Sequence, residues 1–326
     1  MNRAAQISFV LLAALMALIA WLNLGTFLLT ALFGYLALRV FNFRHIKVLS
    51  VALYLLTVVI AGAGLLYFAA LAYRTFPKIA EAAIPAMVEF AEKNGIDLPF
   101  TDYASLKISA LEEAKEGVAV IGRYARIASF QTVLLLAGLV VALSAFLNPS
   151  WTADRSATEI KNVYSEITEE LGLRFRNFYQ SFARVMGAQI LIAAINTVLT
   201  ALFLIFSGYP YAPLLLCLVF LCGLLPIVGN LISNTVIVGV GFTLSPKMGL
   251  LALIFLITIH KLEYFLNSKI IGARIDSPMW LTLIGLVVGE RLMGVPGLIL
   301  APVILHYIKF EASAYRSLEK ERLGPD

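Results

Sequence analysis

Long runs of apolar residues, separated by short polar stretches, fill most of this chain. A helix needs roughly 20 apolar residues to cross the hydrocarbon core of a bilayer, which is about 30 Å thick. The pattern predicts about eight such spans: Ala4–Leu22, Leu24–Phe41, Val48–Tyr73, Ile127–Leu147, Val185–Phe206, Tyr211–Leu244, Met248–Asn267 and Met279–Tyr307. We therefore expect an all-α integral membrane protein.

Proline and glycine interrupt the sixth and eighth predicted spans. The first break is Leu225–Asn230, and the second lies within Gly289–Gly297. Irregular backbone survives in a membrane only where it is buried in protein or lines a cavity, and transporters place their sites at such breaks. Two broken helices indicate a membrane transport protein, although a simple kink at Pro226 is the alternative. The residues expected to break the eighth span are Gly289, Gly294, Pro296 and Gly297.

Two polar segments separate the apolar runs. Apolar and charged positions alternate at helical spacing in Tyr103–Arg126 and again between Ile160 and Phe182, which predicts an extracytoplasmic and a cytoplasmic or interfacial amphipathic helix. They either cover the ends of the bundle or form an oligomer contact or a gate. The expected parts of the chain are 1–73, 74–126, 127–147, 148–184, a transport core at 185–310 and a tail at 311–326.

Composition supports a membrane protein. Hydrophobic residues make up 60% of the chain and charged residues 14%, against about 45–50% and about 25% in soluble domains. The net charge of +5 comes without a basic stripe that carries aromatic residues, so we expect no nucleic-acid partner. Lysine and arginine collect around Arg39, Arg44 and Lys47 and in the tail, which predicts that both termini are cytoplasmic.

Polar and ionisable side chains in a membrane are costly, so they are candidates for function. His260 and Glu263 lie three residues apart on one helix face, where they either relay protons or bind a cation, or hold a structural position at the interface. Glu290 and Arg291 either meet partners on other spans or lie in an exposed loop between half-helices. The candidate pathway residues are Pro226, Gly229, Asn230, Asn234, His260, Glu263, Asn267, Glu290 and Arg291.

Enzymatic signatures are absent from the sequence. It contains no nucleotide-binding or catalytic motif, so we expect neither an enzyme nor a cofactor, and any active transport is secondary. The two cysteines, Cys217 and Cys222, lie five residues apart in one apolar helix. That spacing predicts neither a disulfide nor a metal site.

Short motifs follow one another along the C-terminal half, beginning with Leu225-Pro226-Ile227-Val228-Gly229 and His260-Lys261-Leu262-Glu263. The first resembles the Ile-Pro-x-x-Gly signature of the autoinducer-2 exporter family of bacterial permease-like proteins, and the second resembles the Gln-x-Ile-Glu motif of that family. Further matches are Gly187-Ala188-Gln189, Lys269–Gly272, Ser277-Pro278, and Gly289–Gly297 with Ala301-Pro302. The sequence departs from the family pattern at Asn230, His260 and Ser268, where proline, glutamine and proline are usual.

The resemblance implies an eight-span protein of the bacterial inner membrane, in contact with membrane lipid and homo-oligomeric, with a pentamer as one form. It implies export of the small polar signal autoinducer-2 or, as in some relatives, sodium/proton antiport. Our leading hypothesis is a secondary transporter or facilitator for a small polar solute, and the alternative is a monovalent cation/proton antiporter. A third hypothesis is a non-transporting scaffold. Glu263 and the Pro226–Gly229 break are carried over as pathway residues.

Overall fold

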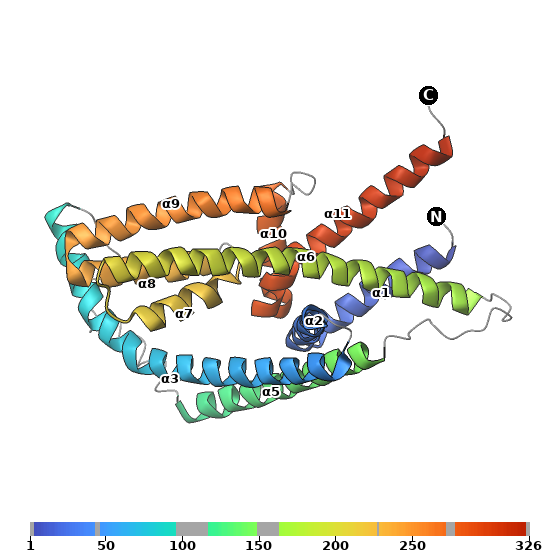
Figure 1. Ribbon diagram of the computed structural model, residues 1–326, viewed down its shortest axis with the longest axis horizontal. Helices are drawn as coiled ribbons and strands as arrows, with labels where there is room; N and C mark the ends of the chain where they lie inside the picture. The colour runs from blue at the N-terminus through green and yellow to red at the C-terminus, as the bar shows by residue number, and fades with distance from the viewer. Residues whose placement is uncertain are drawn as a thin grey trace. The chain divides into compact units, whose positions relative to one another are not determined.

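The structure is a computed structural model that describes residues 3–42, 46–95, 117–148, 163–226, 228–271 and 278–323, and throughout these ranges the ordered elements are helices (Figure 1). The all-α prediction is confirmed. The helices are α1 (Arg3–Trp21), α2 (Gly25–Val40), α3 (Lys47–Lys93), α5 (Gly117–Leu147), α6 (Val163–Phe206), α7 (Ala212–Gly223), α8 (Val228–Leu244), α9 (Pro246–Ile271), α10 (Met279–Met293) and α11 (Val295–Leu323).

Several helices are long and apolar enough to cross a membrane. Five helical stretches meet this criterion among the described residues: Arg3–Trp21, Lys47–Lys93, Ser129–Leu147, Val163–Phe206 and Val295–Ser313. Large apolar side chains along them are exposed, as in Val10 (68%), Leu66 (75%) and Val133 (62%). Apolar surface of this extent is rare on proteins that face water, and it suits a hydrocarbon environment.

The helices form two compact units. Unit 1 consists of Met1–Thr57, Phe130–Gly187 and Ile271–Asp326, and unit 2 of Val58–Ser129 and Ala188–Ile270. The helices α3, α5 and α6 each contribute residues to both units. The expected transport core, residues 185–310, is therefore divided between two units.

Helices continue through the boundaries that composition suggested. The expected boundaries after residues 73, 126, 184 and 310 fall inside α3, α5, α6 and α11. Helical hydrogen bonds join residues four apart, so a helix can pass from an apolar to a polar sequence without ending. The amphipathic helix expected at Tyr103–Arg126 lies mostly outside the described residues, and so does the start of the stripe at Ile160.

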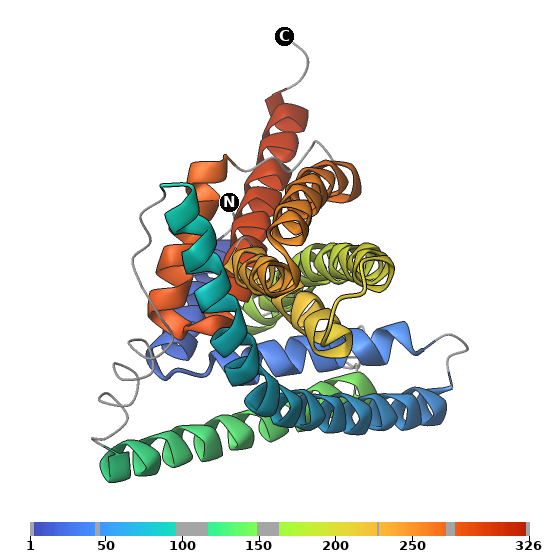
Figure 2. The ribbon, with the colours of Figure 1, turned by 90° about the vertical axis from the view of Figure 1, so that its left-hand side faces the viewer.

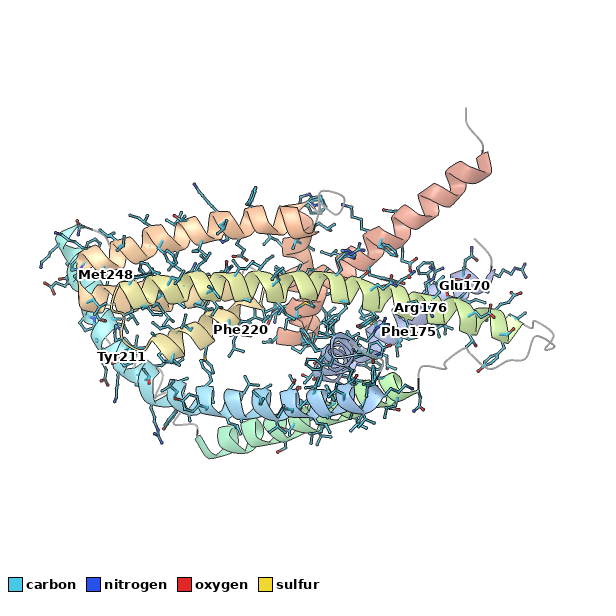
Figure 3. The ribbon with its side chains drawn as sticks, viewed as in Figure 1. Glu170, Phe175, Arg176, Tyr211, Phe220 and Met248 are labelled. Atoms are coloured by element: carbon cyan, nitrogen blue, oxygen red, sulfur yellow. The ribbon has the colours of Figure 1, made fainter. Side chains whose placement is uncertain are left out.

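The sixth predicted span is a helical hairpin, formed by α7 and α8. A Cβ atom on Gly229 would overlap the carbonyl group of Cys222 beside the turn, and one on Gly241 would meet the Tyr209 hydroxyl at the other end. The two helices are therefore antiparallel. Figure 3 shows Phe220 near the turn and Tyr211 at the open end, where Met248 marks the start of α9. The interruption at Pro226 is confirmed, but the chain turns back on itself there instead of continuing in one direction.

The eighth predicted span is also a hairpin, formed by α10 and α11 (Figure 2). The break is confined to Gly294, whose φ of 63° favours glycine. Gly289 lies inside α10, and Pro296 and Gly297 lie in the first turn of α11, so the prediction that these three residues interrupt the helix is wrong. Gly289 and Gly297 instead bring the two backbones into contact, because a Cβ atom on either would overlap the carbonyl group of the other.

Each unit has its own core. In unit 2, Leu204, Leu215 and Ile237 are at most 1% exposed and belong to one apolar cluster that joins α6, α7 and α8. In unit 1, Phe182 of α6 is fully buried and meets the ring of Phe33 edge-on at 5.0 Å. Both cores thus bring together helices that are distant in the sequence.

Candidate functional site

A buried carboxylate, that of Glu263 on α9, is the centre of a polar cluster in unit 2. The residue is 9% exposed, and the side-chain amide of Asn230 donates a hydrogen bond to its Oε2 atom. The amide of Asn196 donates a longer hydrogen bond, 3.4 Å, to the same oxygen. The Nδ1 atom of His260 lies 4.0 Å from it. The cluster thus joins α6, α8 and α9.

The turn of the α7–α8 hairpin places Asn230 against this carboxylate. The Nε2 atom of Gln189 on α6 donates to the carbonyl oxygen of Gly223 at 2.6 Å, which satisfies an acceptor that the end of α7 would otherwise leave unpaired. A Cβ atom on Gly223 would lie 2.9 Å from the Ala193 methyl group, so α7 and α6 pack closely there. Asn230 follows in the first turn of α8, beyond Pro226.

A small polar cavity adjoins Glu263. Its volume is about 10 Å³, which is close to the smallest volume that holds one water molecule. Polar side chains from three helices line it: Asn196 and Thr200 from α6, Asn230, Ser233 and Asn234 from α8, and His260 and Glu263 from α9. Such a lining can hold a proton, a water molecule or a small cation, or the polar end of a solute if the hairpin moves.

Two amide groups and one imidazole surround the carboxylate of Glu263. The amide groups of Asn230 and Asn196 both point their donors at Glu263, and hydrogen bonds to an ionised group are stronger than those between neutral groups. The side chain of His260 is 66% exposed, and it forms an ion pair with Glu263 only when it is protonated. Among the residues that the structure describes, no group of three or more His, Cys, Asp or Glu side chains could hold a metal ion.

A larger cleft in unit 1 is a weaker candidate. It measures about 420 Å³ and is lined mainly by apolar residues of α1 and α11, such as Phe9, Leu12 and Ile304. Its acidic residue, Glu311, already accepts hydrogen bonds from Arg174 at 2.6 Å and from Asn177 at 3.0 Å. The polar chemistry of a transport site is therefore better developed at Glu263.

Comparison with known proteins identifies the family. A family model described as "AI-2E family transporter" matches residues 6–317. The chain belongs to the AI-2E transporter family. The match covers nearly the whole chain, so it confirms the resemblance found in the C-terminal motifs and extends it to the N-terminal half. No solved structure matches this AI-2E family member significantly.

One relative is the "Putative transport protein YdbI" of Bacillus subtilis (strain 168). It is 27% identical to this AI-2E family member over 219 residues, which are 65% of this chain and 62% of the relative. The matched part therefore spans less than two thirds of the relative. Its printed name describes transport and states no solute.

Four of the predicted pathway residues of this AI-2E transporter come together around the cavity: Asn230, Asn234, His260 and Glu263. The side chain of Asn267 lies outside the described residues. Glu290 and Arg291 are exposed residues of the last turns of α10, in unit 1, whereas the Glu263 cluster belongs to unit 2. Pro226 and Gly229 shape the hairpin turn and do not line the cavity.

Sequence reasoning missed two polar residues that line the cavity, Asn196 and Thr200. Both lie on α6 and are buried, at 5% and 1% exposure. Their spacing of four residues places them on one helix face. A polar pair at that spacing inside the apolar run Val185–Phe206 was the signal that could have identified them.

Proposed function

We propose that this AI-2E family member is a secondary transporter that exports a small polar solute, such as autoinducer-2, through the Glu263 cluster. The observation that carries the proposal is a buried carboxylate held by the Asn230 amide at the turn of a helical hairpin. Interrupted helices form the binding sites of many transporters, and an ionisable residue at such a site is a functional candidate because its burial is costly.

The energy source of the proposed transport is an ion or proton gradient. The sequence has no nucleotide-binding motif, so hydrolysis within this chain is not the expected source. Glu263 is the group that we assign to the coupling proton or cation, because binding of either to a carboxylate neutralises the net charge of the site. Solute binding and ion binding at one cluster would then be linked directly.

We further propose that the protein lies in the bacterial inner membrane with both termini in the cytoplasm. Lysine and arginine are concentrated near Arg39 and Lys47 and in the tail, as is typical of cytoplasmic loops. The α7–α8 and α10–α11 hairpins each return the chain to the side of the membrane from which it came. Both termini can therefore still lie in the cytoplasm. Assembly into a homo-oligomer remains a proposal by family resemblance.

Transport in inverted membrane vesicles tests the proposal. Glu263→Gln removes the titratable group and Pro226→Ala restores a backbone donor in the hairpin turn, so we expect either change to abolish autoinducer-2 accumulation while the protein still inserts. Glu89→Gln is the matched control, because Glu89 is an exposed acid on α3 whose side chain is 69% accessible. Wild-type accumulation by Glu263→Gln would refute the proposal.

Monovalent cation/proton exchange is a second candidate function, and the size of the cavity favours it. A volume of about 10 Å³ suits a water molecule or a bare ion better than an organic solute. In proteoliposomes that contain a pH-sensitive dye, a sodium pulse should change the fluorescence, and Glu263→Gln should remove the response. Absence of any sodium response in the wild type would eliminate this candidate.

A further inference from the structure

One hydrogen-bonding atom in the Glu263 cluster has no partner. The Oδ1 atom of Asn196 is buried and, within the part of the chain that the structure describes, accepts no hydrogen bond. The Nδ2 group of the same amide faces Glu263, because the reverse orientation would set two acceptors against each other. An unpaired buried acceptor costs free energy, so its retention beside a cavity indicates that something else supplies the donor.

Glu263 adds further acceptor capacity beside Asn196. The Asn230 and Asn196 amides both donate to Oε2 of Glu263, and no described residue donates to its Oε1 atom. The hydroxyl of Ser233 lies within hydrogen-bond distance of the carbonyl oxygens of Gly229 and Asn230, at 3.2 and 3.3 Å, so its proton is directed at the backbone. Donors are also present in the lining, on Thr200, Asn234 and His260, although the side chain of His260 is mostly outside the cavity at 66% exposure.

We propose that Asn196 is a solute-binding residue whose Oδ1 atom accepts a hydrogen bond from the transported molecule. The inference rests on the proposed transport function of the Glu263 cluster and specifies the class of solute. An unpaired acceptor beside a carboxylate favours a neutral or cationic molecule that donates hydrogen bonds through hydroxyl or amino groups. It disfavours carboxylates and phosphates, because like charges repel and leave the acceptors unpaired.

Transport kinetics of Asn196 variants test this assignment. Asn196→Leu should raise the KM for autoinducer-2 by about tenfold, because loss of one hydrogen bond that leaves its partner unpaired weakens binding by about that factor. The maximal rate should change little. Asn196→Asp should keep the KM within about threefold, because two adjacent carboxyl groups share a proton and so preserve both the acceptor and the donor to Glu263. Thr197→Val is the control, since the Thr197 hydroxyl donates to the Ala193 carbonyl oxygen at 2.7 Å.

Competition between two small molecules tests the solute class. Propane-1,2-diol and lactate are similar in size but differ in that lactate carries a carboxylate, so the diol should inhibit autoinducer-2 transport and lactate should not. Equal inhibition by both would overturn the predicted preference. An unchanged KM in Asn196→Leu, with transport lost in Glu263→Gln, would overturn the role of Asn196 and leave the transport function intact. Wild-type transport by Glu263→Gln would overturn both the role of Asn196 and the proposed transport function.

Discussion

The side-chain amide of Asn230, in the first turn of α8, donates a hydrogen bond to the carboxylate of Glu263 on α9, 33 residues further along the chain. This contact couples the hairpin turn to the only buried carboxylate of its cluster. A movement of the hairpin would therefore change the hydrogen bonding of Glu263, and a change in the charge of Glu263 would change the position favoured by the hairpin. Transport needs a link of this kind between binding and movement.

Removal of the Asn230 amide should impair both stability and transport. Asn230→Leu leaves the carboxylate with only the long hydrogen bond from Asn196, and loss of a hydrogen bond to a charged group costs about 1.5–3 kcal/mol. We expect the proposed autoinducer-2 transport to fall at least about tenfold, as each 1.4 kcal/mol corresponds to a factor of ten. Asn94→Leu, at the exposed end of α3, is the control, and an equal loss in both variants would contradict the expectation.

Gly229 should tolerate no side chain. A Cβ atom there would overlap the carbonyl group of Cys222, so Gly229→Ala forces the α7–α8 hairpin apart. Overpacking of this kind costs about 1–3 kcal/mol, and we expect a lower midpoint of thermal unfolding in detergent. At Gly62 a Cβ atom would meet nothing within 4 Å, so Gly62→Ala should be neutral or stabilising by up to about 1 kcal/mol. Equal midpoints for the two variants would show that the hairpin is not packed as described.

The buried ion pair between Arg174 and Glu311 should be costly to break on one side. Their side chains are 7% and 6% accessible and meet at 2.6 Å, and Arg174 also contacts Glu170, on the same helix (Figure 3), at 3.0 Å. Arg174→Met alone leaves the buried carboxylate of Glu311 without an opposite charge and with only the hydrogen bond from Asn177, which should reduce the free energy of unfolding by about 3–5 kcal/mol. The double variant Arg174→Met/Glu311→Leu should lose less, and the double-mutant cycle measured by chemical unfolding checks this.

Because α7 and α8 form a hairpin, we expect the turn before α7 and the turn before α9 to lie on the same side of the membrane. A Cβ atom on Gly241 would lie 3.0 Å from the Cα of Gly249 and also meet the Tyr209 hydroxyl, so the turns before α7 and before α9 are at one end of unit 2. In a background without Cys217 and Cys222, Ser207→Cys and Lys247→Cys should react with an impermeant thiol reagent from the same side. One straight span across 211–244 would place them on opposite sides.

Sequence alone determined the helices, the interruptions at Pro226 and Gly294 and most of the cluster around Glu263. These features are local: helical hydrogen bonds join residues four apart, a missing backbone donor acts where the proline stands, and the cost of a buried charge belongs to the residue itself. The role of Glu290 stays a prediction, because it depends on which neighbours cover α10.

Tertiary structure decided the direction of the chain after each break and the partners of Glu263. Pro226 and Gly294 permit either a kink or a reversal, and the close approaches of Gly229 to Cys222 and of Gly289 to Gly297 occur in the reversed form. Asn196 joined the site only because α6 packs against the hairpin and α9. Such contacts depend on the shapes of surfaces distant in sequence, which periodicity does not encode, whereas the chemistry of each side chain was already present in the sequence.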